Sequence, residues 1–210
     1  MNWCAALLAL GSSVTAAELV MEDLTCAVQV GPTDMQATVD NGSRSTTVDD
    51  GFTQAYGIRA GIRHGFTRPG AALAPLLGLE LTLTSGEFGD GSTDRRFGAL
   101  LGPGIGWAVG ERCTLLLQGV IGAGLERTTL SATPAYAAID ASGWWWSGAV
   151  RAGALVNVSR RWLVGVEGEY GEAPGNVSGG GLDLTLRPAG LSGALVLVWR
   201  MDPSPAVLER

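Results

Sequence analysis

The sequence predicts an all-β protein, an eight-stranded antiparallel up-and-down transmembrane β-barrel. Three observations predict it: strict alternation of apolar and polar residues, a rhythm of short and long connections, and aromatic side chains at both ends of the apolar faces. The 210 residues suit one domain, and a hydrophobic content of 46% is enough to bury a core or face a bilayer. After the first residues, the chain has no apolar run long enough for a membrane helix. Any membrane crossing is therefore expected to use strands.

The N-terminus has the features of an export signal. Residues 3–10 form a short apolar run, and Val14-Thr15-Ala16 has the small-residue spacing of a cleavage site. We therefore expect a signal peptide over 1–16, a barrel over 17–201 and a short tail over 202–210. A short buried helix is the alternative for the first segment.

The first two strand candidates differ in regularity. Residues 26–39 supply an outward-running strand whose phase changes at Gly31-Pro32, which predicts a bulge. In the next, QAYGIRAGIRHGF, an apolar set that includes Tyr56 and Ile58 alternates with a set that carries Arg59. The same period predicts the remaining strands over 73–84, 97–109, 113–126, 144–158, 162–170 and 191–200.

The final strand is irregular in its first half. Leu184 and Leu186 lie on even positions, whereas the apolar set that begins at Leu191 lies on odd ones. One added residue would restore the phase, so we expect a bulge or a loop-to-strand boundary near Pro188.

The connections alternate between short and long. Short turns are expected at 64–72, 110–112 and 159–161, and longer polar loops at 40–51, 85–96, 127–143 and 171–183. An antiparallel meander has this rhythm when its ends face different compartments, with short turns in the periplasm and longer loops outside.

The placement of aromatic residues favours lipid over a protein core. Tryptophan and tyrosine are enriched where hydrocarbon meets headgroups, and the apolar faces carry large aromatics near both ends. The predicted girdle comprises Phe52, Phe97, Trp107, Trp144, Trp146, Trp162, Tyr170 and Trp199. Between them the outward positions hold no charge, as a bilayer core requires. The sequence thus predicts an outer-membrane location, and a soluble lipocalin-like ligand-binding barrel is the alternative.

At this level the chain resembles the small eight-stranded bacterial outer-membrane proteins related to the transmembrane domain of outer-membrane protein A, and the porin-like surface antigens. The resemblance covers residues 18–201 and is one of pattern. The run from Leu191 to Met201 is similar to a terminal strand read by the barrel-assembly machinery, although Arg200 and Met201 follow the aromatic Trp199. The resemblance implies that the protein contacts outer-membrane lipid, lipopolysaccharide and the barrel-assembly machinery.

Seven charged residues fall on the inward parity: Arg59, Arg63, Glu80, Glu126, Arg151, Glu167 and Glu169. Eight strands enclose a lumen just wide enough for side chains to fill. Because buried charges are tolerated when they are paired, we expect Arg151 to bridge Glu80 and Glu167 and so close the lumen. A narrow pore or transport protein lined by these residues is the alternative.

Other chemistry finds little support in the sequence. His64 is the one histidine and falls in an expected inner turn, so a Ser-His site cannot be built at the outer rim. Glu87, Asp90 and Asp94 lack the full spacing of a calcium loop. Two cysteines, at 26 and 113, lack metal-ligand spacing, although one disulfide between them is conceivable. We expect no catalytic residue, no metal and no cofactor.

The expected function is non-enzymatic: envelope structure, or surface interaction through the extracellular loops. The segment 126–146, which spans the longest expected loop, ends in Trp144, Trp145 and Trp146; alternation directs Trp145 inward, where it would cap the lumen. A net charge of -6 without a basic cluster makes nucleic acid an unsuitable partner. The sequence does not identify an extracellular ligand.

Overall fold

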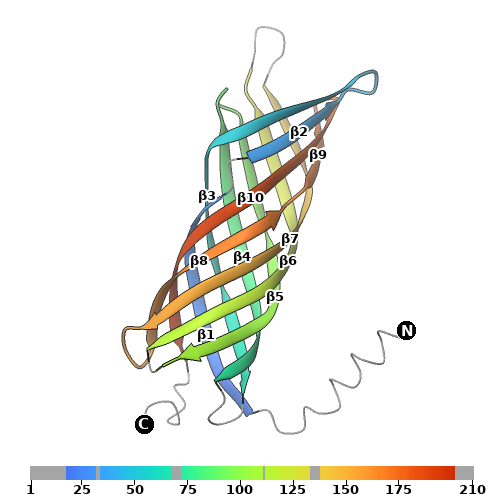
Figure 1. Ribbon diagram of the computed structural model, residues 1–210. Helices are drawn as coiled ribbons and strands as arrows, with labels where there is room; N and C mark the ends of the chain where they lie inside the picture. Colours follow the sequence, from blue (N-terminus) through green and yellow to red (C-terminus); the bar gives the residue numbers. More distant parts are fainter. Residues whose placement is uncertain (1–17, 32–33, 68–71, 111, 133–137, 202–210) are drawn as a thin grey trace, which may run out of the picture.

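The computed structural model describes residues 18–31, 34–67, 72–110, 112–132 and 138–201, and it is an all-β barrel (Figure 1). The predicted signal peptide and C-terminal tail lie outside these residues. The strands are β1 (Glu18–Val30), β2 (Asp34–Asp40), β3 (Ser45–Thr67), β4 (Leu73–Phe88), β5 (Thr93–Val109), β6 (Cys113–Leu130), β7 (Ile139–Asn157), β8 (Trp162–Glu172), β9 (Gly175–Gly179) and β10 (Leu182–Arg200). Among the described residues no helix has the length and hydropathy to span a membrane.

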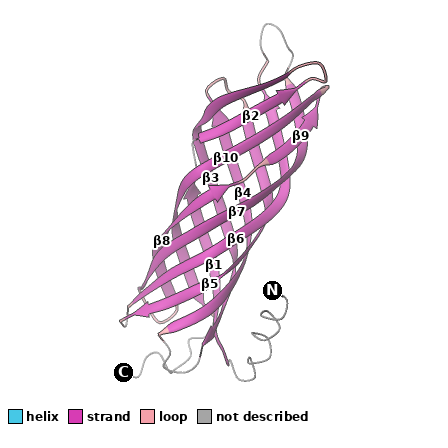
Figure 2. Ribbon diagram, turned by 45° about the vertical axis from the view of Figure 1, so that its right-hand side comes forward, coloured by secondary structure: helices cyan, strands magenta, loops and turns pink. Residues whose placement is uncertain are grey.

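Eight of these strands close into a ring, so the predicted fold is confirmed. Every neighbouring pair is antiparallel, in the order β1, β3, β4, β5, β6, β7, β8 and β10, and β10 returns to β1 along the register Asp23↔Arg200 to Val30↔Gly193. The two other strands prolong ring strands: β2 follows β1 between β3 and β10, and β9 follows β8 between β7 and β10. Figure 2 shows the strands winding obliquely around the barrel, as closure requires.

The first strand starts earlier than predicted. It begins at Glu18 instead of residue 26, and its pairing with β3 starts at Glu18↔Thr67. The bulge predicted at Gly31-Pro32 falls partly outside the described residues. β1 ends at Val30 and β2 begins at Asp34, and the Gly31 amide donates to the Ala55 carbonyl at 2.8 Å.

The short turn predicted at 159–161 agrees with the structure, whereas residues 64–67 of the turn predicted at 64–72 belong to β3 and most of the residues between 67 and 72 lie outside the described ones, as does residue 111. The predicted long loops are wrong. Most of their residues are paired strand: Asp40↔Ser45, Glu87↔Thr93, Leu130↔Ile139 and Leu182↔Gly179 are the outermost pairs. Polar residues are typical of loops, but in this chain they cover the solvent-exposed outside of a sheet that continues beyond the membrane. The barrel is therefore taller than the bilayer needs.

The wall of the barrel is apolar on its outside over the height between the aromatic side chains. Leu79, Ile105 and Val150 are 51%, 46% and 58% exposed, and they belong to a continuous belt of exposed Leu, Ile and Val. Soluble proteins rarely expose an apolar surface of this extent to water. In a closed barrel, the backbone N–H and C=O groups of the wall form hydrogen bonds with neighbouring strands, as a membrane interior requires. The chain is an outer-membrane β-barrel. Because such barrels have short periplasmic turns, we expect its short turns to face the periplasm and its tall end to lie outside the cell.

Above the apolar belt, the outward residues are polar and the inward residues are apolar. The bulge expected near Pro188 is therefore absent. β10 keeps one parity along its whole length: Leu184, Leu186 and Pro188 are buried inside, while Asp183 and Arg187 are exposed. Pairing with β2 continues from Asp183↔Asp40 to Pro188↔Met35 without a shift. The apolar residues change face in the sequence because the surroundings outside the barrel change from hydrocarbon to water.

The prediction that Phe52 belongs to the aromatic girdle is wrong. A bulge between Phe52 and Gln54 shifts the register of β3 against β4 and turns Phe52 inward. There it is 7% exposed and packs on Phe88, with ring centroids 4.8 Å apart. Met35 and Leu186 complete an apolar cluster inside the extracellular end of the barrel.

Candidate functional site: the closed lumen

Six of the seven predicted lumen charges meet at mid-height inside the barrel. β3 contributes Arg59 and Arg63, β4 contributes Glu80, β7 contributes Arg151, and β8 contributes Glu167 and Glu169. All come from inward positions of their strands, since successive side chains alternate between lumen and lipid. Three guanidinium groups and three carboxylates give the cluster a formal charge of zero.

Glu80 lies at the centre of this ion-pair network. Its carboxylate accepts from Arg59 at 3.1 Å, from Arg63 at 3.1 Å and from Arg151 at 2.8 Å. Glu167 accepts from Arg59 at 2.9 Å and Arg63 at 2.6 Å, whereas its distance to Arg151 is 3.8 Å. The second close partner of Arg151 is instead Glu169, at 2.7 Å.

Glu126 does not join this network. It belongs to a second cluster nearer the extracellular end, where Arg96 donates to Glu126 at 2.6 Å and to Asp94 at 2.8 Å, and also to the Ala173 carbonyl. Thr128 donates to Asp94 at 3.0 Å. The sequence reading missed Asp94 and Arg96 because it assigned them to a loop; extending the parity of Gly98 and Gly102 outward identifies both as inward residues.

An apolar layer closes the periplasmic side of the lumen. It consists of Ala27, Leu76, Leu116, Leu155, Leu163, Val196 and Val198. Leu163 and Val198 have exposed fractions of 1% and 0%. These side chains pack together below the ion-pair network.

Glycines on β5 make room for two large inward side chains. A Cβ at Gly98 would lie 2.5 Å from the indole of Trp145, and a Cβ at Gly104 would lie 2.7 Å from Cγ of Gln118. Gln118 donates to the Gly102 carbonyl at 3.0 Å, and the Trp145 indole donates to the Leu125 carbonyl at 3.1 Å. The nearly bare glycine face of β5 thus faces bulky residues from neighbouring strands.

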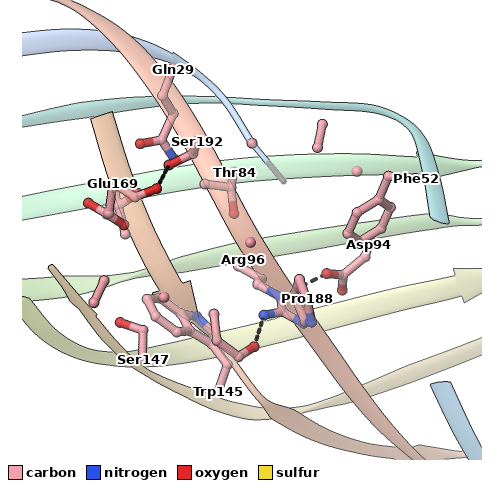
Figure 3. A pocket seen from close by; sticks show the side chains of 18 of the residues that line it. Gln29, Phe52, Thr84, Asp94, Arg96, Trp145, Ser147, Glu169, Pro188 and Ser192 are labelled. Carbon is pink, nitrogen blue, oxygen red and sulfur yellow. Dashed lines mark hydrogen bonds and ion pairs between the residues drawn. The ribbon is translucent and has the colours of Figure 1, made fainter. Parts of the chain in front are cut away.

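Between the two charged clusters lies a cavity of about 120 Å³ (Figure 3). Glu169 and Ser192 lie at one end of the view, and Arg96, Asp94 and Phe52 lie at the other. By volume it holds several water molecules, and its walls combine hydroxyls with the Trp145 indole. Trp145 is 5% exposed and packs against Leu100 and Val120, so the inward orientation predicted for it is confirmed.

The other predicted girdle residues lie on the outside of the wall. Phe97, Trp144, Trp146 and Tyr170 are exposed near the outer end of the belt, and Trp107 and Trp162 are exposed near its inner end. Trp199 is half-buried against Trp162, with ring centroids 6.5 Å apart.

The residues considered for other chemistry do not converge. His64 lies in β3 and not in a turn, with its Nδ1 3.7 Å from a Glu22 carboxylate oxygen at the periplasmic end. Asp90 caps the turn by accepting from the Ser92 amide at 2.8 Å, while Asp94 points into the lumen. Cys26 and Cys113 are both free, so the conceivable disulfide is not formed. In the part of the chain that the structure describes, no group of three or more His, Cys, Asp or Glu has the geometry of a metal site.

Comparison with known proteins gives a likeness in shape alone. No protein-family model matches the sequence, and no curated protein matches it. Among solved structures, Ail, the attachment invasion locus protein of Yersinia pestis, is similar with 12% identity and a TM-score of 0.40, covering 84% of this chain and 98% of Ail.

Two further structures give comparable values. Neisserial surface protein A has 9% identity and a TM-score of 0.46, and covers 86% of this chain and 97% of its own. The outer membrane protease OmpT from Escherichia coli has 10% identity and a TM-score of 0.45, and covers 90% of this chain and all of its own. These identities carry no residue of those proteins over to this one.

Proposed function

We propose that this protein is a non-enzymatic outer-membrane barrel with a closed lumen, which serves envelope structure or surface interaction through its extracellular end. The observation that supports it is the stack of lumen layers: an apolar layer, a charge-balanced ion-pair network, and a second apolar cluster around Phe52. A permeation path needs a continuous wet passage, and the apolar layer alone interrupts it.

The extracellular end is suited to contact with other molecules in water. Its outward positions carry hydroxyls and charges that bond across strands, such as Thr38 with Thr47 at 3.0 Å and Thr185 with Asn176 at 2.9 Å. Because the strands continue beyond the girdle, this surface is held by backbone pairing instead of by long loops. We also propose that the end of β10 is read by the barrel-assembly machinery, since Leu191 to Trp199 alternates up to a terminal aromatic.

Single-protein current recordings in planar bilayers test the closed lumen. The wild-type barrel is expected to give no steady current, and Arg151→Ala is expected to give at most brief, small openings, because the apolar layer still seals the periplasmic side. Arg161→Ala, in an exposed periplasmic turn, is the matched control for loss of one arginine. Steady conductance steps from the wild-type protein would contradict the proposal and favour a narrow pore.

A further inference from the structure

An amphipathic groove runs along the outer wall of the barrel at the upper edge of the membrane belt. It has a volume of about 770 Å³, and its lower part is lined by Leu83, Phe97, Leu125 and Trp144. All four are exposed, with fractions between 48% and 68%. Their position at the outer girdle places this part against lipid chains.

Two arginines form the upper part of the same groove. Arg95 lies directly opposite Arg127 in the β5–β6 register, one outward position above the pair Phe97↔Leu125, which is about 7 Å along the strand. Ser142 continues this row on β7. The guanidinium groups are therefore at headgroup height, directly above a surface that binds acyl chains.

The two arginines of this row differ in their ion pairs. Arg127 pairs with Asp140 at 3.0 Å, with side chains 67% and 58% exposed, while no ion pair reaches Arg95 within the described residues. Hydrogen bonds from Thr129 and Arg127 hold the pKa of Asp140 below its usual value, so this carboxylate stays ionised at neutral pH. Asp140 is thus engaged by Arg127, and Glu87 lies on the outward face of β4, one outward position above Ser85, the register partner of Arg95. Arg95 and Arg127 face each other directly, and like charges placed directly opposite destabilise a sheet unless an anion joins them.

We propose that Arg95 and Arg127 bind the phosphate group of a phosphorylated glycolipid of the outer leaflet, whose acyl chains lie on Leu83, Phe97, Leu125 and Trp144. Guanidinium groups match phosphate oxygens with forked hydrogen bonds, which are stronger than neutral ones. The apolar half of the groove selects a lipid over a soluble phosphate. This inference depends on the membrane placement and not on whether the lumen conducts.

The test measures binding of diphosphorylated lipid A to the purified full-length barrel in phosphatidylcholine nanodiscs, with native mass spectrometry counting the retained lipid. R95Q/R127Q is expected to weaken the apparent affinity about tenfold or more, because each charge-assisted hydrogen bond to phosphate contributes to binding. The apparent affinity of R95K/R127K is expected to lie between those of the wild type and R95Q/R127Q, since lysine keeps the positive charge but cannot form the paired hydrogen bonds of a guanidinium group.

Controls separate this site from general charge effects. R112Q/R161Q removes two exposed arginines from periplasmic turns and is expected to bind like the wild type. Lipid A without phosphates is expected to bind as weakly as R95Q/R127Q, and inorganic phosphate at millimolar concentration is expected not to displace the bound lipid. Equal retention by the wild type and by R95Q/R127Q, with both showing heat-modifiable gel mobility, would overturn the proposal; so would equal retention of the dephosphorylated lipid.

Discussion

Glu80→Gln is expected to lower the free energy of unfolding by about 3 to 5 kcal/mol, the cost of breaking a buried ion pair from one side. Glu80 is 4% exposed and accepts hydrogen bonds from three arginines. Glutamine keeps the shape and removes the charge, so three guanidinium groups then face two carboxylates in a space from which water is largely excluded. Urea unfolding of the barrel in lipid vesicles, followed by tryptophan fluorescence, measures the loss.

Two comparisons show whether this cost comes from the network. Glu22→Gln removes a half-exposed carboxylate that lies 3.7 Å from His64, and is expected to cost less than about 1 kcal/mol. The double variant Glu80→Gln/Arg63→Gln restores charge balance, so its cost is expected to be smaller than the sum of the two single variants by about 1 kcal/mol or more. Additive costs, or a Glu80→Gln effect no larger than that of Glu22→Gln, would mean that the network does not hold the barrel together.

Trp145→Ala is expected to lower the free energy of unfolding by about 3 to 5 kcal/mol, the range for removing a large aromatic from a packed interior. The indole is 5% exposed, lies over Gly98 and Gly124, and bonds to the Leu125 carbonyl. Because these glycines have no side chain that could fill the space left by the indole, the resulting void joins the lumen cavity. The same vesicle unfolding assay measures the effect.

The neighbouring Trp146 provides the matched control. It faces outward and is 57% exposed, so lipid chains take the place of its indole, and Trp146→Ala is expected to cost about 1 kcal/mol or less. Similar losses for the two variants would contradict the inward packing of Trp145.

The sequence predicted the closed barrel and most of its lumen because alternation assigns each residue to one of two faces. In β4, Leu79 and Leu81 are outside and Glu80 is inside, as the alternation predicted. Alternation does not say what each face contacts. Leu184 and Leu186 therefore seemed out of phase, although the strand is regular and only the surroundings change.

Two other differences have local causes. Phe52 was assigned to the outside because one bulged residue, at position 53, reverses the parity of everything before it, and such a bulge leaves no mark in the alternation that follows. The segment of Asp94 and Arg96 predicts a loop because it is rich in polar residues and glycine, which are also typical of turns. The register between consecutive strands, Phe52↔Phe88 and Gly86↔Asp94, decides these positions.

The inverted polarity of the tall end has a consequence for biogenesis. Its exterior carries exposed Asp34, Asp40, Asp183 and Arg187, and each such charge costs several kcal/mol to move through hydrocarbon. A closed barrel therefore cannot cross the bilayer from the periplasm with these charges on its outside. The extracellular hairpins have to be translocated before β1 pairs with β10 and closes the barrel. After the barrel has closed, the same charges hold the extracellular end outside the bilayer, because they would have to enter the hydrocarbon for the protein to move back toward the periplasm.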